Sequence, residues 1–152
     1  MVTLENTQKI VPFLWFDNNA EEAADFYCSL FKNAKVTMRS PLVVGFELEG
    51  MKFMGLNGGP QFKPNEAFSI YVNCEDQQEV DALWNKLTSD GGEEGQCGWL
   101  KDKYGFSWQI VPTLLSKLMS DPDREKSQRV MDAMLKMRKM DMAELQAAFD
   151  GN

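Results

Sequence analysis

The chain of 152 residues contains no histidine, and this absence excludes several classes of catalytic site. Histidine is the commonest general base and a frequent metal ligand, and its ordinary pKa lies close to physiological pH. Nucleophile systems that pair serine or cysteine with histidine are therefore excluded. Cysteine is also scarce, because the chain has only Cys28, Cys74 and Cys97, without a paired spacing. An odd number of cysteines without a secretion signal predicts reduced thiols in a cytoplasmic protein.

The chain also has fewer positive than negative charges, and it has no long apolar segment. The 16 lysines and arginines stand against 23 aspartates and glutamates, which gives a net charge of −7. A chain of this charge repels phosphate backbones and anionic lipids, so we expect neither nucleic acid nor a membrane surface as a partner. No apolar run approaches the roughly 18 residues of a membrane span. Met1–Glu5 lacks the basic and apolar regions of a signal peptide.

The chain carries two similar strand–helix units at an offset of 57 residues. Residues 9–16 and 67–73 are short apolar runs typical of strands. Asn19 and Asp76 each stand three residues before a glutamate, the spacing of a capping box at a helix start. Apolar residues follow each box at helical spacing. The match favours an internal duplication, although any two strand–helix units can be brought into partial register.

Further short strands complete each unit. Residues 44–48 alternate apolar and polar side chains, which is the period of a half-buried strand. Asp102 and Gly105 occupy the first and fourth positions of a type I turn, which predicts a hairpin. Residues 58–66 have the composition of a linker. The predicted additional strands cover residues 35–40, 42–49, 52–57, 96–101 and 106–111.

The last forty residues predict a helical tail. Asp121-Pro122 has the form of a helix start with proline in the first turn. Asp141 begins a third capping box, and Gly151 can end the final helix. The apolar face must bury against its own domain or against a second subunit, and methionine-rich faces also suit adaptable partner surfaces. We expect a homodimer in which part of this tail contacts the partner. The apolar face comprises Val130, Met131, Met134, Leu135 and Met137.

Residues Cys97–Pro112, read as CGWLKDKYGFSWQIVP after two strand–helix units, resemble the vicinal oxygen chelate superfamily, also called the glyoxalase/bleomycin-resistance superfamily. Within it the chain is similar to the PhnB-like branch, labelled 3-demethylubiquinone-9 3-methyltransferase. The opening PFLWFD of Pro12–Asp17, the Phe26-Tyr27 pair and Met137–Ala148 agree with that branch. Cys97–Pro112 is the specific part of the resemblance.

The resemblance implies an α+β fold of paired βαβββ modules that form a curled mixed sheet around a cavity. Repeat one would cover about residues 9–58 and repeat two about 67–112, within a glyoxalase-like domain over 1–120. Residues 121–152 would form a C-terminal helical tail. Members of the superfamily are usually dimers.

Metal enzymes of this superfamily hold one divalent ion in the cavity, where it acts as a Lewis acid. The resemblance places the ligand positions of the family at Pro12, Ser69 and Gln109. Proline has no donor side chain, and a neutral serine or glutamine binds a divalent ion weakly. The resemblance therefore implies the cavity, while these departures predict no metal and no other cofactor.

Strand parity indicates which side chains would line that cavity. In strand 106–111, one face carries Phe106, Trp108 and Ile110, and a sheet backed by helices needs such an apolar face. The other face mixes polar and apolar groups, as small-molecule pockets do, although it could also be an open face in water. The predicted cavity residues are Pro12, Leu14, Ser69, Tyr71, Ser107 and Gln109.

Three residues are candidates for the pocket rim. Trp99 could stack on an aromatic ligand. Cys97 is a nucleophile only if a nearby lysine activates it, and an incidental thiol is the favoured interpretation. Asp102 could act as a general base, but its position in the predicted turn favours a capping role.

These observations favour a protein that binds or sequesters a small organic molecule without catalysis. The alternative is a lyase, isomerase or transferase that works through Gln109, Tyr71, Asp102 or Cys97. The methyltransferase label is not supported by a cofactor motif, because binding S-adenosylmethionine in the common fold uses a glycine-rich turn between a strand and a helix. Gly58-Gly59 precedes a linker, and Gly91-Gly92 follows a helix.

Overall fold

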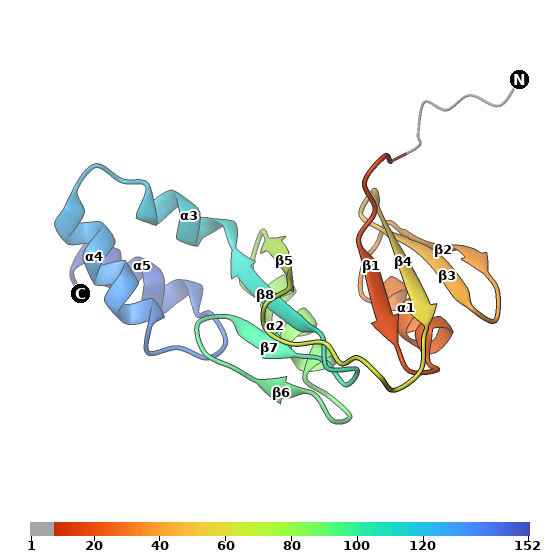
Figure 1. Ribbon diagram of the computed structural model, residues 1–152. Helices are drawn as coiled ribbons and strands as arrows, with labels where there is room; N and C mark the ends of the chain where they lie inside the picture. The colour runs from red at the N-terminus through yellow and green to blue at the C-terminus, as the bar shows by residue number, and fades with distance from the viewer. Residues whose placement is uncertain (1–7) are drawn as a thin grey trace, which may run out of the picture. The chain divides into compact units, whose positions relative to one another are not determined.

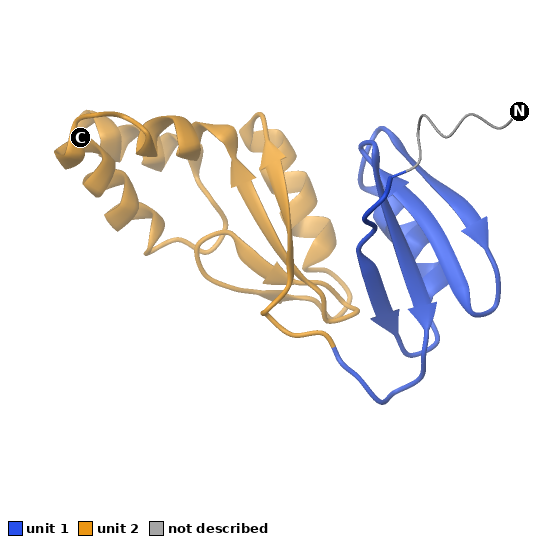
Figure 2. Ribbon diagram, turned by 45° about the horizontal axis from the view of Figure 1, so that its top comes forward, with its two compact units in different colours: residues 1–63 blue, residues 64–152 orange. Residues whose placement is uncertain are grey.

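Each half of the chain folds into a four-stranded mixed sheet with one helix against it (Figure 1). The structure is a computed structural model and describes residues 8–152. Two units are distinguished by their internal contacts, residues 1–63 and residues 64–152 (Figure 2). Both units have the βαβββ order, and helices follow the second, so the predicted α+β class with glyoxalase-like modules is confirmed.

The first unit has the strand order β1-β4-β3-β2, in which β1 runs parallel to β4 and the other pairs are antiparallel. The three strands after the helix agree with the sequence prediction to within one or two residues at each end. The elements are β1 (Phe13–Phe16), α1 (Ala20–Ser29), β2 (Ala34–Arg39), β3 (Val43–Leu48) and β4 (Met51–Asn57).

Small residues bring α1 close to the first sheet. A Cβ atom at Gly55 would lie 3.1 Å from the Phe16 ring and 3.4 Å from Ala20 Cβ, so glycine permits the approach of strand and helix. The rings of Tyr27 on α1 and Phe46 on β3 lie 5.9 Å apart, and both side chains are buried. This face of the sheet is the core of the first unit.

The capping box predicted at Asn19 is wrong. Among residues 8–152 the Asn19 side chain makes no capping hydrogen bond, and the Ala20 N–H donates to Asn57 Oδ1 at 2.9 Å instead. The second box forms in part, because Asp76 Oδ1 accepts from the Glu79 N–H at 2.8 Å. The Glu79 carboxylate accepts from the N–H of Glu75, one residue before the cap. A side chain of β4 thus replaces the local cap in the first unit.

The second unit has the strand order β5-β8-β7-β6, with β5 parallel to β8. The two-residue strand β6 is missed by the sequence pattern because it is too short to show alternation. The predicted strand 96–101 starts only at Trp99, because Cys97 and Gly98 have φ values of 57° and 82°. The elements are β5 (Ser69–Cys74), α2 (Gln77–Leu87), β6 (Glu93–Glu94), β7 (Trp99–Lys101) and β8 (Ser107–Pro112).

Helix α2 covers one face of the second sheet. The indole N–H of Trp84 on α2 donates to Glu94 Oε1 at 2.7 Å, and Glu94 pairs in register with Leu100, which pairs with Trp108. Register partners project to the same side of a sheet. Trp108 and Ile110 are therefore buried on the α2 side, as the parity of β8 predicts.

Three helices follow β8. They are α3 (Thr113–Met119), α4 (Arg124–Met134) and α5 (Met142–Asp150). The sequence pattern misses α3, and α4 begins after Asp123, whose carboxylate accepts from two backbone N–H groups, and not at Asp121-Pro122. The cap of α5 at Asp141 and the left-handed Gly151 at its end are confirmed. In the described part of the chain no helix has the length and apolar character needed to cross a bilayer.

Candidate functional site

The second sheet presents a polar face on the side opposite α2. The register aligns Ser69 on β5 with Ser107 on β8, and Ser107 with Lys101 on β7. One step along, Gln109 on β8 lies between Tyr71 and Trp99. These six side chains project to one side because each is two residues from its neighbour on the same strand. We call this surface the β8 polar face: Ser69, Tyr71, Trp99, Lys101, Ser107 and Gln109.

The centre of the β8 polar face contains a hydroxyl that lacks a partner. Ser107 is 1% exposed, and its Oγ has no hydrogen-bond partner among residues 8–152. Burying an unsatisfied hydroxyl costs about 1–3 kcal/mol. The adjacent Gln109 donates through Nε2 to Ser69 Oγ at 2.9 Å. The Ser107 hydroxyl is thus a buried hydrogen-bonding group at the centre of this face that is unused within the described residues.

Two aromatic rings flank the glutamine. Tyr71 is 47% exposed and Trp99 is half-buried, and both are register neighbours of Gln109. Aromatic side chains supply flat apolar surface beside a hydrogen-bonding group. Lys101 is paired with Glu66, and this contact holds the pKa of the Glu66 carboxyl below its usual value. The face can therefore combine stacking with one or two polar contacts.

Two of the predicted cavity residues, Pro12 and Leu14, belong to the first unit. The side of the sheet to which alternate residues of β1 project is the opposite of the predicted one. Leu14 is buried and pairs in register with Gly55, on the side packed against α1. Its predicted place in the cavity is therefore wrong. Phe13 and Trp15 project to the opposite side, and Phe13 is 51% exposed. Pro12 lies just before β1, where its carbonyl accepts from the Met54 N–H at 3.0 Å.

Asp102 belongs to the interior, which corrects its expected place at the rim. It is 2% exposed, and its Oδ1 accepts from the N–H groups of Tyr104 and Phe106 at 2.8 and 3.0 Å. Its Oδ2 accepts from Trp108 Nε1 at 2.9 Å, on the α2 side of the sheet. The capping interpretation of this carboxylate is thus the one the structure shows.

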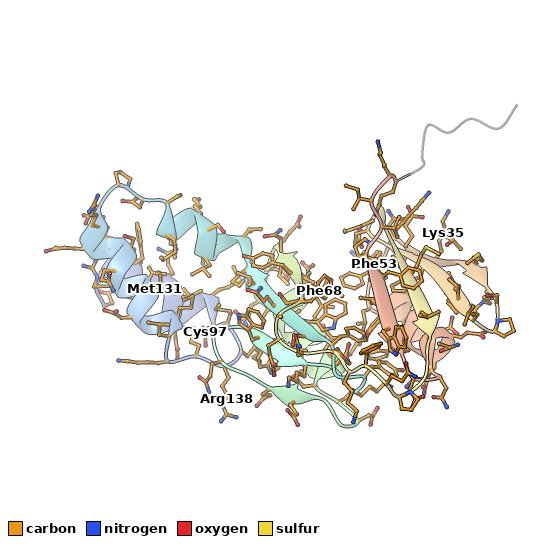
Figure 3. All side chains as sticks on the ribbon, viewed as in Figure 1. Lys35, Phe53, Phe68, Cys97, Met131 and Arg138 are labelled. Atoms are coloured by element: carbon orange, nitrogen blue, oxygen red, sulfur yellow. The ribbon has the colours of Figure 1, made fainter. Side chains whose placement is uncertain are left out.

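The three cysteines are unpaired in the described part of the chain. Burial raises the pKa of the Cys74 thiol to about 12, with Glu79 and Asp76 adding to the shift. Burial likewise raises the pKa of Cys28. Because a nucleophilic cysteine needs a lowered pKa, neither of these thiols is activated. Cys97 is half-buried, at a turn beside the C-terminal helices (Figure 3).

The donor groups present do not fit the divalent ion that the fold family implies. Of the three matching positions, Pro12 has no donor side chain, and Ser69 and Gln109 hydrogen-bond to each other. Within residues 8–152, no three side chains of histidine, cysteine, aspartate or glutamate are grouped closely enough to hold a metal. The groups that the β8 polar face offers are hydrogen-bonding and aromatic side chains.

Comparison with known proteins agrees with the observed fold. The family model described as 3-demethylubiquinone-9 3-methyltransferase matches residues 8–111, well over half of the chain. The chain belongs to this family. The family lies in the glyoxalase/bleomycin-resistance superfamily, so the resemblance seen in the sequence is confirmed. No curated protein matches this family member.

Solved structures show the same fold. A putative 3-demethylubiquinone-9 3-methyltransferase, the PhnB protein from Bacillus cereus, is 32% identical with a TM-score of 0.64, and the match covers 69% of this chain and 99% of that one. Protein PA1353 from Pseudomonas aeruginosa is 19% identical with a TM-score of 0.57, over 70% and 98% of the two chains. A glyoxalase-related enzyme from Fulvimarina pelagi is 16% identical with a TM-score of 0.51, over 71% and 91%.

Sequence patterns miss one set of contacts near the site. The segment of residues 137–142, which leads into α5 and includes its first residue, hydrogen-bonds to the turn before β7 and to α2. It lies beyond the family match, which ends at residue 111. Most of these bonds use backbone atoms, which carry no residue signature, so periodicity and motif spacing give no sign of them.

Proposed function

We propose that this family member binds a small organic molecule with a carbonyl or hydroxyl oxygen on the β8 polar face, and that it sequesters this molecule without a protein-bound metal. The observation that carries the proposal is the Ser107 hydroxyl, which is buried and lacks a partner among residues 8–152. A ligand oxygen that accepts from Ser107 Oγ would remove the cost of the unsatisfied group. No other atom of the face combines deep burial with an unused hydrogen bond in the described residues.

The positions of the Tyr71 and Trp99 rings favour a flat ligand. Tyr71 and Trp99 flank Gln109, so a planar ring could lie against an aromatic surface while its oxygens face Ser107. The description of the matched family names a quinone, which is a planar ring with oxygen substituents. Small hydroxyquinones are therefore the first probe class.

The same family description favours a transferase as the second candidate. Tyr71, Gln109 and Cys97 would then be the groups near the reacting atoms. Within residues 8–152, however, no glycine-rich turn joins a strand to a helix: Gly58 follows β4 but leads into the 58–68 connection, and Gly91 follows α2. The common form of S-adenosylmethionine site is thus missing from the described chain, and sequestration remains our first proposal.

Native mass spectrometry of freshly purified protein, followed by a binding assay, tests the proposal. We expect a copurified small molecule, and we expect Ser107→Ala to weaken its binding by about tenfold, the effect of one buried hydrogen bond. Ser116→Ala, on the exposed side of α3, is the matched control and should bind as wild type does. Equal affinity of Ser107→Ala and wild type would overturn the proposal. Turnover of the captured molecule would favour the enzyme.

The native mass spectrum also gives the number of subunits in the assembly. We propose a homodimer in the cytoplasm, where the three unpaired cysteines would stay reduced. Strand edges favour assembly, because β2 and β6 end their sheets with unpaired backbone groups unless a neighbour covers them.

A further inference from the structure

The turn before β7 is held by the C-terminal segment. The Cys97 N–H donates to the Met137 carbonyl and the Gly98 N–H to the Arg138 carbonyl, both at 2.8 Å. Cys97 has a φ of 57°, a left-handed conformation that is unfavourable for a residue with a Cβ atom. Such a conformation persists only where surrounding contacts hold it. Here the contacts on the two N–H groups come from outside the matched family region.

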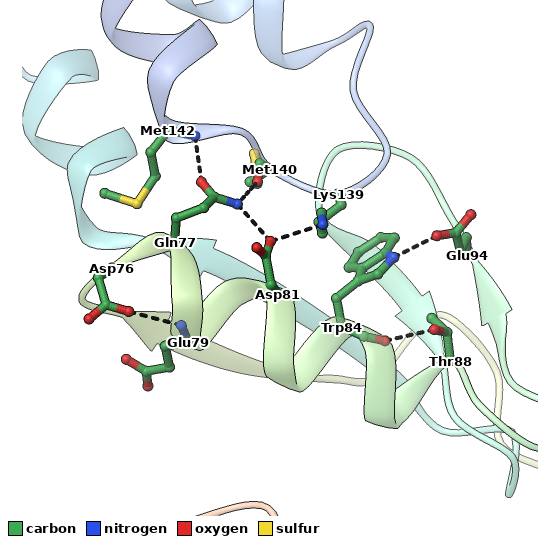
Figure 4. A network of polar contacts seen from close by, with 10 residues as sticks. All are labelled: Asp76, Gln77, Glu79, Asp81, Trp84, Thr88, Glu94, Lys139, Met140 and Met142. Atoms are coloured by element: carbon green, nitrogen blue, oxygen red, sulfur yellow. Dashed lines mark hydrogen bonds and ion pairs between the residues drawn. The ribbon is translucent and has the colours of Figure 1, made fainter.

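The other side of this segment is fixed to α2 (Figure 4). The Gln77 side chain donates to the Met140 carbonyl at 3.0 Å and accepts from the Met142 N–H at 2.8 Å. Asp81, one turn further along α2, accepts from Gln77 at 2.9 Å and pairs with Lys139 Nζ at 2.9 Å. The segment is therefore fixed to the rigid helix that backs the sheet.

Packing adds to these polar contacts. Met140 is buried, and a Cβ atom at Gly98 would lie 3.1 Å from Met140 Cε. The methionine thus covers the glycine of the turn directly. The Gly98 carbonyl in turn accepts from the Ile110 N–H at 2.8 Å, which connects the turn to β8. The next residue after the turn is Trp99, the ring neighbour of Gln109.

We infer that residues 137–142, which we call the tail clamp, set the conformation of the 96–98 turn and thereby position the Trp99 ring on the β8 polar face. Gln77 is the positioning residue of this arrangement, because its side chain bonds to the clamp on both sides of Asp141. The effect on ligand affinity rests on the proposed function, whereas the positioning of Trp99 stands without it. The C-terminal segment would thus shape one wall of the β8 polar face.

The test compares Gln77→Ala with Gln78→Ala, an exposed neighbour on the same helix. Amide hydrogen exchange at Cys97 and Gly98 measures how firmly the clamp holds the turn. The fluorine NMR signal of fluorotryptophan at Trp99 measures a change in the surroundings of the ring, and Trp99→Phe assigns this signal. We expect Gln77→Ala to accelerate exchange at both amides by about tenfold, the loss of roughly one hydrogen bond, and to shift the Trp99 signal. Gln78→Ala should leave both unchanged.

Unchanged exchange at Cys97 and Gly98 in Gln77→Ala would overturn the clamp. Faster exchange with an unmoved Trp99 signal would overturn the positioning of the ring. If Gln77→Ala does not fold, Lys139→Ala replaces it in the test, because this variant removes only the ion pair with Asp81. It should change the exchange rates and the Trp99 signal in the same direction as expected for Gln77→Ala, but to a smaller extent.

Binding of 2-hydroxy-1,4-naphthoquinone separates this inference from the proposed function. If the clamp positions Trp99 for ligands, Gln77→Ala should raise the dissociation constant by at least about threefold while Gln78→Ala does not. An unchanged constant in Gln77→Ala would overturn the link between clamp and affinity. If wild type binds neither this quinone nor any copurified small molecule, the proposed function fails, and the exchange and fluorine signals still decide the clamp.

Discussion

Trp108 donates its indole N–H to Asp102 Oδ2 at 2.9 Å in the interior of the second unit. The other oxygen of the same carboxylate accepts from two backbone N–H groups of the hairpin turn. A single buried side chain therefore joins the turn between β7 and β8 to the central aromatic residue of the core. A carboxylate at this depth is tolerable because its oxygens are hydrogen-bonded.

Asp102→Ala should lower the free energy of unfolding by about 2–4 kcal/mol, because it leaves buried N–H donors without an acceptor. Asp102→Asn keeps the acceptor for the turn but sets an amide against the indole N–H, so we expect a smaller loss of about 1–2 kcal/mol. Urea unfolding measures both values. A double-mutant cycle with Trp108→Phe should show coupling, and additive losses would mean that the indole bond contributes nothing.

The two faces of β8 predict opposite effects of neighbouring substitutions. Trp108 is fully buried, so Trp108→Ala should cost about 3–5 kcal/mol of stability. Gln109→Leu removes one half-buried hydrogen bond, so it should cost only about 0.5–1.5 kcal/mol while ligand binding is lost. Chemical denaturation and a binding assay on the same samples separate the effects. If Gln109→Leu unfolds the protein and Trp108→Ala spares it, the face assignment of β8 is inverted.

The sequence predicts the buried face of a strand only where the two faces of the strand differ in polarity. In β8 one set of alternate residues is apolar and the other is mixed, so the buried face follows from the pattern. In β1 all four of Phe13–Phe16 are apolar, and alternation cannot decide the side. Contact with Gly55 and Ala20 decides it, and these residues come from other elements. The cap of α1 escapes prediction for the same reason, since Asn57 lies 37 residues away.

The sequence predicts which residues share the polar face where this depends on strand parity, and it misses the contacts that depend on turns and the tail. Ser69, Tyr71, Ser107 and Gln109 share a face, as expected. The turn signature at Asp102 was correct, but the sequence does not show that its carboxylate also reaches Trp108. The clamp on Cys97 and Gly98 uses main-chain carbonyls, which every residue has.

The cysteines should differ sharply in reactivity. Alkylation by iodoacetamide at about pH 8 should modify Cys97 first and leave Cys74 protected, because a thiol reacts as its thiolate. The pKa of Cys74 is raised from about 9 to about 12, so its protonated form is favoured by folding. This contribution to stability is fully present below about pH 9 and is lost as the pH rises towards 12. Peptide mass spectrometry gives the order, and early modification of Cys74 in folded protein would contradict it.

Elemental analysis after gentle purification should find no stoichiometric divalent ion. The expected reason is chemical, because Pro12, Ser69 and Gln109 occupy the ligand positions of the family and none of them is a strong ligand. Gln109→Glu is a useful companion variant, since it introduces a carboxylate at one such position. Stoichiometric zinc, nickel, manganese or iron in wild type would contradict the prediction.

Light scattering should report a dimer at micromolar concentration. If the tail contributes to the interface, a charge on its exposed apolar surface should weaken the dimer without unfolding the chain. Leu135, which follows the last residue of α4, is 57% exposed and suits this test, and exposed Lys136 supplies a control as Lys136→Ala. We expect Leu135→Lys to shift the protein towards monomer. A wild-type monomer would contradict the dimer itself, and an unchanged dimer in Leu135→Lys would place the interface elsewhere.

The origin of the two helix caps bears on the order in which the chain folds. Asp76, the residue just before α2, caps this helix locally, so the helix can begin before any sheet exists. Helix α1 receives its cap from Asn57, at the end of the last strand of its unit. That hydrogen bond forms only after the chain has closed a long loop, which is slow compared with local contacts. Two modules with the same βαβββ order would then reach their native states by different routes, the second from a local helix and the first only when its whole sheet assembles.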